Sequence, residues 1–127
     1  MTRDAARRIL LVDDIEANRV ALELELAEAG FAVTSAGSGN AAAALIDKGF
    51  DALVTDIWMP DGDGIELLRT LRARAPGMLV YAVTGGGPGM SLASASSLAK
   101  IWDARRVYIK PFDVRTLVAD LRGDLGV

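Results

Sequence analysis

Acidic, hydroxyl and amine side chains follow short apolar stretches at four separate places in this sequence. Three are carboxylates, one is a hydroxyl and one is an ammonium group; the five residues are Asp13, Asp14, Asp56, Thr84 and Lys110. Three carboxylates brought together repel one another and raise each other's pKa unless a cation neutralises them. Hard oxygen ligands of this kind select Mg²⁺. If the fold gathers these side chains, the sequence predicts a magnesium site.

Asp56 is the central carboxylate of this set, so we predict that it is a nucleophile. With a metal and the Lys110 ammonium nearby, a phosphoryl group can be held by charge while the carboxylate attacks phosphorus to form an acyl phosphate. The chain has no histidine and no cysteine, which excludes imidazole bases, phosphohistidine, thiolate metal sites and disulfides. Taken singly, each residue also has an ordinary structural explanation, such as a helix cap or a strand end.

Short β-rich apolar runs alternate with longer helical stretches, which is typical of βα units around a parallel sheet buried on both faces. The predicted strands are 9–12, 32–34, 52–55, 79–83 and 107–109. The predicted helices are about 16–29, 39–48, 65–75 and 90–102, with a fifth that is capped by Asp113 and finishes near Leu125. Ligands of such sheets bind at the carboxyl ends of the strands, and the five acidic, hydroxyl and amine residues named above all follow predicted strands at that edge.

Composition narrows the class of protein. At 127 residues and 51% hydrophobic content, the chain suits one compact domain with a real core. A formal net charge of -3 argues against binding to nucleic acid, which needs clustered Lys and Arg. No segment reaches the run of about 18 apolar residues that spans a membrane, and the first eight residues lack the apolar stretch of a signal peptide. We therefore expect a cytoplasmic protein with no membrane partner.

Taken jointly, the order of these motifs resembles the receiver domain of response regulators, of the CheY-like superfamily, over nearly the whole chain. The stretches that carry the resemblance are Val12-Asp13-Asp14, Asp56-Ile57-Trp58-Met59-Pro60-Asp61-Gly62-Asp63-Gly64, Thr84-Gly85 and Lys110-Pro111-Phe112. The resemblance implies a doubly wound, flavodoxin-like α/β fold, with five parallel strands in the order 2-1-3-4-5 and five helices. We expect a single receiver over 1–127, with a core of about 8–125 and no output domain.

The resemblance also implies roles for residues. Asp56 would take a phosphoryl group from a histidine kinase or a histidine phosphotransfer protein. Asp14, Asp56 and the Trp58 backbone carbonyl would ligate Mg²⁺ directly, and Asp13 would act largely through water. The phosphoryl oxygens would be bound by Thr84, Lys110 and the Gly85 amide. Such a protein is not an enzyme for other substrates: it catalyses only its own phosphorylation and dephosphorylation, and signals as a monomer or weak homodimer through a separate, unidentified partner.

Two positions depart from the family pattern. Trp58 stands where a small or polar residue is common, and Val107 stands where a switch aromatic is usual. Tyr108 is one place later and should point to the opposite sheet face, so we expect it in the core. Trp58, Thr84 and Val107 are therefore the candidate switch or modulator positions, but a threonine–aromatic switch cannot be assumed. Trp58 is expected to border the acyl phosphate and to slow its hydrolysis.

The first helix carries apolar residues on two faces when its positions are spaced by 100°. Leu22 and Leu26 are the expected core pair. Three residues on the other face, namely Ala17, Val20 and Leu24, then form an exposed strip that suits docking of a helical partner. The alternative is that these are ordinary surface aliphatic residues.

Two other functional classes stay open. A metal-dependent phosphatase can also use an aspartyl nucleophile, but it needs a further acid two residues later, where this chain has Trp58. A receiver that has lost phosphorylation and serves only as a binding scaffold would fit the changes at Trp58 and Val107. The five acidic, hydroxyl and amine positions that remain argue against the scaffold.

Overall fold

The computed structural model describes residues 6–57, 59, 64–85, 97 and 103–127. Five parallel strands form one sheet in the order β2-β1-β3-β4-β5, which is the order implied by the resemblance to receiver domains. The strands are β1 (Arg8–Val12), β2 (Ala32–Ala36), β3 (Ala52–Asp56), β4 (Leu79–Thr84) and β5 (Arg106–Ile109). Each begins or ends within two residues of its predicted limits.

The central strands are buried on both faces, because successive side chains point to opposite sides of the sheet. On β1 and β3, Leu10 and Leu53 belong to one hydrophobic cluster, whereas Leu11 and Val54 belong to another. All four side chains are at most 1% exposed. Continuous apolar runs, rather than an alternation of apolar and polar residues, are what this two-sided burial requires.

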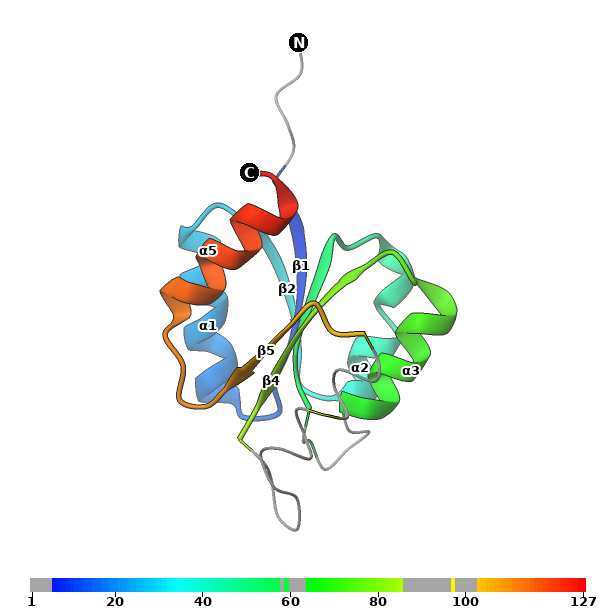
Figure 1. Ribbon diagram of the computed structural model, residues 1–127. Coiled ribbons are helices and arrows are strands. Elements are labelled where there is room, and N and C mark those ends of the chain that lie inside the picture. The colour runs from blue at the N-terminus through cyan, green and yellow to red at the C-terminus, as the bar shows by residue number, and fades with distance from the viewer. Residues whose placement is uncertain (1–5, 58, 60–63, 86–96, 98–102) are drawn as a thin grey trace.

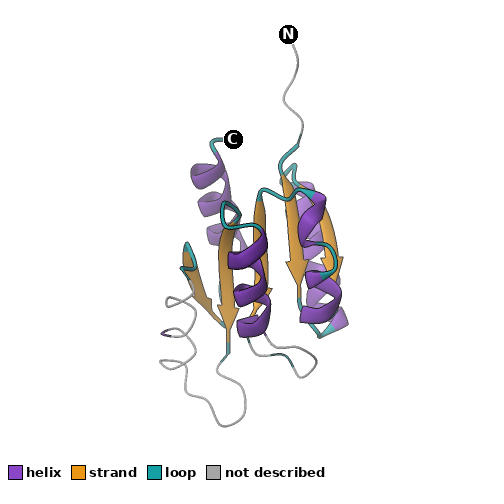
Figure 2. Cartoon of the chain, turned by 90° about the vertical axis from the view of Figure 1, so that its right-hand side faces the viewer, coloured by secondary structure: helices purple, strands orange, loops and turns teal. Residues whose placement is uncertain are grey.

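Helices cover the two faces of the sheet (Figures 1 and 2). One face carries α1 (Glu16–Glu28) and α5 (Val114–Leu125), and the other carries α2 (Gly39–Ala43) and α3 (Gly64–Arg74). The cap at Asp113 is confirmed, since its carboxylate accepts a hydrogen bond from the Arg115 amide at 2.9 Å. Gly30, at a φ of 102°, supplies the left-handed residue that stops the chain after α1.

The second helix differs from the prediction of one helix over 39–48. The α-helix stops at Ala43, and a separate 3₁₀ turn, η1, covers Ile46–Lys48. Around this break the amides of Leu45 and Lys48 donate to carbonyls three residues back, which is the tighter 3₁₀ spacing. Gly49, at a φ of 84°, then closes the turn. The four consecutive alanines, residues 41–44, have high helix propensity. Their small side chains bury little apolar surface, however, so packing does little to stabilise a longer helix.

Four of the five predicted α-helices are therefore present in the described residues. The predicted fourth helix, 90–102, falls almost wholly outside the residues that the structure describes. Within those that it does describe, no helix combines the length and the apolar character needed to cross a bilayer.

One buried carboxylate ties the last helix to the sheet. The Asp124 side chain on α5 is 6% exposed and accepts hydrogen bonds from three groups. These donors are the Tyr81 hydroxyl at 2.7 Å, the Arg106 Nε at 2.9 Å and an Arg105 guanidinium nitrogen at 3.1 Å. Tyr108 makes a similar bond to Asp120, at 2.6 Å. The α5 helix is therefore fixed against β4 and β5 by polar as well as apolar contacts.

Candidate functional site

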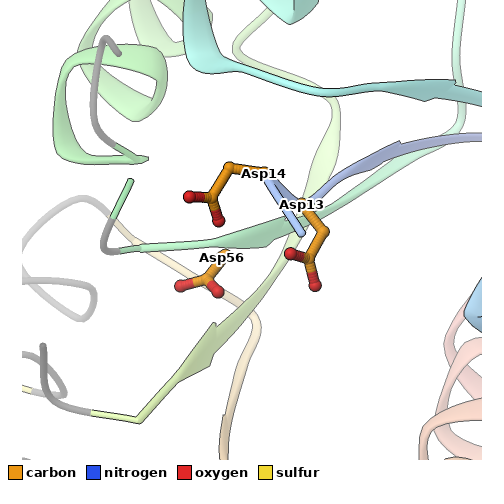
Figure 3. Close-up of side chains that lie close together, drawn as sticks. All are labelled: Asp13, Asp14 and Asp56. Carbon is orange, nitrogen blue, oxygen red and sulfur yellow. The ribbon is translucent and has the colours of Figure 1, made fainter. Parts of the chain in front are cut away.

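Three carboxylates meet at the carboxyl edge of the sheet, where β1 and β3 lie side by side. Val12, the last residue of β1, pairs with Thr55, so Asp13 continues directly beside Asp56. Figure 3 shows Asp13, Asp14 and Asp56 around the same space. Each offers an oxygen, and these oxygens all lie within 4.8 Å of one another. A set of hard oxygen donors at this spacing fits a divalent cation such as Mg²⁺.

Lys110 comes to the same place from the end of β5. Its Nζ lies 2.6 Å from Oδ2 of Asp56 and 3.9 Å from Oδ2 of Asp13. Its backbone amide donates to the Thr84 carbonyl at 2.9 Å, and the Lys110–Pro111 peptide bond is cis. Burial lowers the pKa of Lys110, but the hydrogen bond to Asp56 and the surrounding carboxylates outweigh it, so the pKa is raised. The Lys110 side chain therefore stays protonated and positively charged at neutral pH.

Asp13 is held by the start of α1. Its Oδ1 accepts a hydrogen bond from the Ile15 amide at 2.9 Å, and its carbonyl accepts one from the Arg19 guanidinium at 2.9 Å. Burial raises the pKa of Asp13 above its usual range, and the Ile15 bond offsets this only in part. Arg19 was not singled out from the sequence. Its position one turn into the first helix was the only signal available.

Gly64, at the start of α3, packs directly against the backbone of Asp56, the predicted phosphoryl acceptor. A side chain there would overlap the backbone oxygen of Asp56 and the backbone of Ile57. Its amide donates to the Ile57 carbonyl at 2.8 Å. From the sequence, Gly64 had no predicted role beyond its place in the family motif. Glycine at this place in the acidic loop was the available signal, because only glycine permits so close an approach.

The remaining predicted site residues divide into three groups. Thr84 is fully buried at the end of β4, and the next residue, Gly85, lies beside Lys110, because a Cβ placed on Gly85 would be 3.8 Å from the lysine side chain. Val107 is half-buried on the α3 side of the sheet, and Tyr108 is buried on the opposite side, as expected. Trp58 lies outside the described residues, so its carbonyl and its ring are not placed.

The predicted docking strip is confirmed as an exposed surface. Val20 is 47% exposed and Leu24 is 60% exposed, and Ala17 is exposed beside them. Leu26 is fully buried and Leu22 packs against the same cluster, so the core pair was assigned correctly. The strip begins in the first turn of α1, at Ala17, close in sequence to Asp13 and Asp14.

Comparison with known proteins defines the family. Residues 9–122 match the response regulator receiver domain. The chain is 37% identical over 120 residues to the transcriptional regulatory protein FixJ of Azorhizobium caulinodans, covering 91% of this chain and 54% of FixJ. It is 36% identical over 119 residues to the response regulator receiver protein CpdR of Brucella abortus, covering 91% of this chain and 93% of CpdR. The chain thus spans about half of one relative and nearly all of the other.

Solved structures agree. A receiver domain protein from Methanospirillum hungatei superposes with a TM-score of 0.85 at 30% identity, covering 95% of this chain and 94% of that chain. The receiver domain of sensor histidine kinase PA1611 from Pseudomonas aeruginosa gives 0.84 at 26% identity, covering 97% and 100%. That structure holds a magnesium ion in its active-site cleft. The present chain belongs to the response regulator receiver domain family, a family of two-component signalling proteins whose members accept phosphoryl groups.

Proposed function

We propose that this chain is a phospho-acceptor receiver of a two-component phosphorelay in the cytoplasm, and that Asp56 takes the phosphoryl group. The observation that carries the proposal is the short bond between Lys110 and Asp56 at the edge where Asp13 and Asp14 also lie. Asp13 is also buried and also lies near Lys110, but at 3.9 Å, whereas Asp56 lies within hydrogen-bond distance of the ammonium group at 2.6 Å.

The proposed reaction is a direct transfer. A carboxylate oxygen of Asp56 attacks phosphorus, forming a P–O bond, while the P–N bond to the donor's phosphohistidine breaks and its electrons return to the imidazole nitrogen. Lys110, already 2.6 Å from the acceptor, is placed to bind a phosphoryl oxygen. Thr84 and the Gly85 amide are proposed to bind the others. In hydrolysis, water attacks phosphorus and the P–O bond to Asp56 breaks, which releases inorganic phosphate and restores the carboxylate, so the chain acts only on itself.

Asp13, Asp14 and Asp56 are the side chains that would hold Mg²⁺, with the Trp58 carbonyl as a further proposed ligand. Their close oxygens fit the ion, and Lys110 alone cannot balance three carboxylates. Bound there, the ion would neutralise the charge that develops on the transferring group.

The proposed donor is a histidine kinase or histidine phosphotransfer protein that meets the docking strip Ala17, Val20 and Leu24. The strip is apolar and exposed, and it lies at the start of α1 beside the acceptor edge. Burying such surface favours association by about 25 cal/mol per Å². The downstream partner that binds the phosphorylated receiver is proposed to be a separate protein. The receiver itself is proposed to be a monomer or weak homodimer.

Intact mass spectrometry after incubation with Mg²⁺ and acetyl phosphate tests the proposal. The wild-type chain should gain one phosphoryl group, and Asp56→Asn should gain none. Asp51→Asn, at the opposite edge of the sheet, is the matched control and should behave as the wild type. A wild-type chain that gains no mass would favour the scaffold alternative, and a gain that persists in Asp56→Asn would move the acceptor elsewhere.

A further inference from the structure

The main chain of Asp13 is anchored to two neighbouring elements, at the point where β1 ends and the chain turns toward α1. The Asp13 amide donates a hydrogen bond to the carbonyl of Ala36, the last residue of β2, at 3.2 Å. The Asp13 carbonyl accepts a hydrogen bond from Nη1 of Arg19, on α1, at 2.9 Å. The loop that carries the first two carboxylates is therefore held from both sides.

The Asp13 carbonyl belongs to the peptide unit that joins Asp13 to Asp14. Because a peptide unit is planar, a bond that holds its oxygen also sets the direction in which the chain continues to the Cα of Asp14. Both residues contribute oxygens to the acidic cluster with Asp56 (Figure 3), and these oxygens all lie within 4.8 Å of one another. The Arg19 bond thus acts on the peptide unit between two of the three proposed metal ligands.

The guanidinium of Arg19 lies against Gly37, in the turn between β2 and α2. A Cβ on Gly37 would be 3.1 Å from Nη1 of Arg19 and 3.6 Å from its Cζ. The φ of Gly37 is outside the left-handed region, so the backbone does not require glycine at this place. Gly37 is also exposed, so no core packing limits the size of its side chain. The missing side chain instead leaves the space that the Arg19 guanidinium occupies.

Arg19 has two opposing effects on a cation that binds at the acidic cluster. By its charge alone it would weaken Mg²⁺ binding, because like charges repel. As a donor to the Asp13 carbonyl it would strengthen binding, since groups that orient metal ligands typically change metal affinity by about tenfold or more. The two effects have opposite signs, so removal of the side chain tells them apart.

We infer that Arg19 is a positioning residue for metal binding: its guanidinium, seated against Gly37, holds the Asp13–Asp14 peptide unit so that both carboxylates stay beside Asp56. Arg19 acts through this peptide unit and not as a ligand, because a guanidinium has no acceptor to offer a metal. The inference rests on the proposed function, in which these three carboxylates hold Mg²⁺. It gives α1, which also carries the docking strip, a direct connection to the metal site.

The test measures the dissociation constant for Mg²⁺ on the full chain, from the amide NMR shifts of Asp13 and Asp56 during a MgCl₂ titration at constant ionic strength. Arg19→Met should weaken Mg²⁺ binding about tenfold, although it removes a repelling charge. Arg122→Met is the matched control, because its guanidinium also joins a helix to a backbone carbonyl, that of Ala29 at 2.6 Å. Its dissociation constant should stay within about twofold of the wild type. Unchanged or tighter binding by Arg19→Met would overturn the inference.

Gly37→Val tests the same contact from the other side. Its methyl groups would take the space of the guanidinium, so the change should weaken Mg²⁺ binding at least about threefold. In an Arg19→Met background it should add less than about twofold, because two changes that act through one contact are not additive. An equal loss in both backgrounds, or no loss in the first, would overturn the inference. A wild-type chain that binds no Mg²⁺ would overturn the metal site and this inference together, whereas wild-type binding that Arg19→Met leaves unchanged would overturn the inference alone.

Discussion

The Nζ of Lys110 lies 2.6 Å from Oδ2 of Asp56, so the end of β5 and the end of β3 are joined across β4 by one charge-assisted hydrogen bond. Such bonds are among the stronger polar contacts in proteins. Because Lys110 stands where a phosphoryl oxygen on Asp56 would lie, this bond predicts a catalytic and not only a structural role.

Lys110→Met should slow phosphorylation by acetyl phosphate by at least about tenfold, since it removes the ammonium group that lies 2.6 Å from Asp56 but keeps much of the length of the side chain. The rate is measured as the gain of phosphoryl mass over time at saturating Mg²⁺. Lys48→Met, an exposed lysine at η1, is the control and should leave the rate unchanged. Equal rates for Lys110→Met and the wild type would remove Lys110 from the site.

Mg²⁺ should stabilise the fold, because it relieves the repulsion between Asp13, Asp14 and Asp56. Ligand linkage predicts about 2.7 kcal/mol at a concentration one hundred times the dissociation constant. The melting temperature is followed across a MgCl₂ titration at constant ionic strength. The double variant Asp13→Asn with Asp14→Asn should lose most of the increase. A wild-type melting temperature that does not move with Mg²⁺ would contradict the metal site.

Val20→Glu and Leu24→Glu should slow phosphotransfer from the cognate histidine donor, because each places a charge in the apolar strip that the donor is expected to cover. Phosphorylation by acetyl phosphate should stay at the wild-type rate, since neither residue touches Asp56. Thr116→Glu, on the exposed side of α5, controls for a charge added elsewhere. Normal transfer from the donor to both strip variants would place docking on another surface.

Trp58 lies two positions after the acceptor and is predicted to shield the acyl phosphate from water. Its ring can block a water molecule but offers no acceptor to activate one. Trp58→Asn and Trp58→Ala should therefore lose phosphate faster than the wild type at saturating Mg²⁺. Dephosphorylation is followed by intact mass, with Trp102→Phe as the control. Equal or slower loss in both variants would show that the ring does not protect the phosphoryl group.

The strands and the gathering of the site could be predicted because they follow from patterns that are local in sequence. Apolar runs such as Leu10–Val12 are continuous only when both faces are covered, and residues that directly follow parallel strands must share one edge. Asp13 and Asp56 could therefore be placed together before any geometry was known.

Other features depend on contacts between distant segments and left no such pattern. The break after Ala43 follows from how a short alanine-rich helix packs, not from its propensity, which favours a longer helix. The Asp124 cluster, in which Tyr81, Arg105 and Arg106 donate to one carboxylate, joins residues up to 43 positions apart in sequence. From the sequence alone, Asp124 is indistinguishable from an ordinary surface carboxylate of α5.

That cluster gives a prediction about pH. Hydrogen bonds from the guanidinium groups of Arg106 and Arg105 hold the pKa of Asp124 well below its usual range in the folded chain. An acid whose pKa is lowered by folding contributes stability above its unfolded pKa, about 3.9, and that contribution is lost as the pH falls toward the folded value. Asp124→Asn keeps the shape but loses the charge, so it should lower the free energy of unfolding by about 1–3 kcal/mol at neutral pH.

Urea denaturation from about pH 7 down to about pH 3 measures the difference in unfolding free energy between the wild type and Asp124→Asn. This difference should be constant above about pH 5 and shrink below about pH 4. Asp47→Asn is the matched control, because its ion pair with Arg74 is exposed and should contribute at most about 1 kcal/mol. A difference for Asp124→Asn that is as small as that of Asp47→Asn, or that grows as the pH falls, would show that this carboxylate does not tie α5 to the sheet.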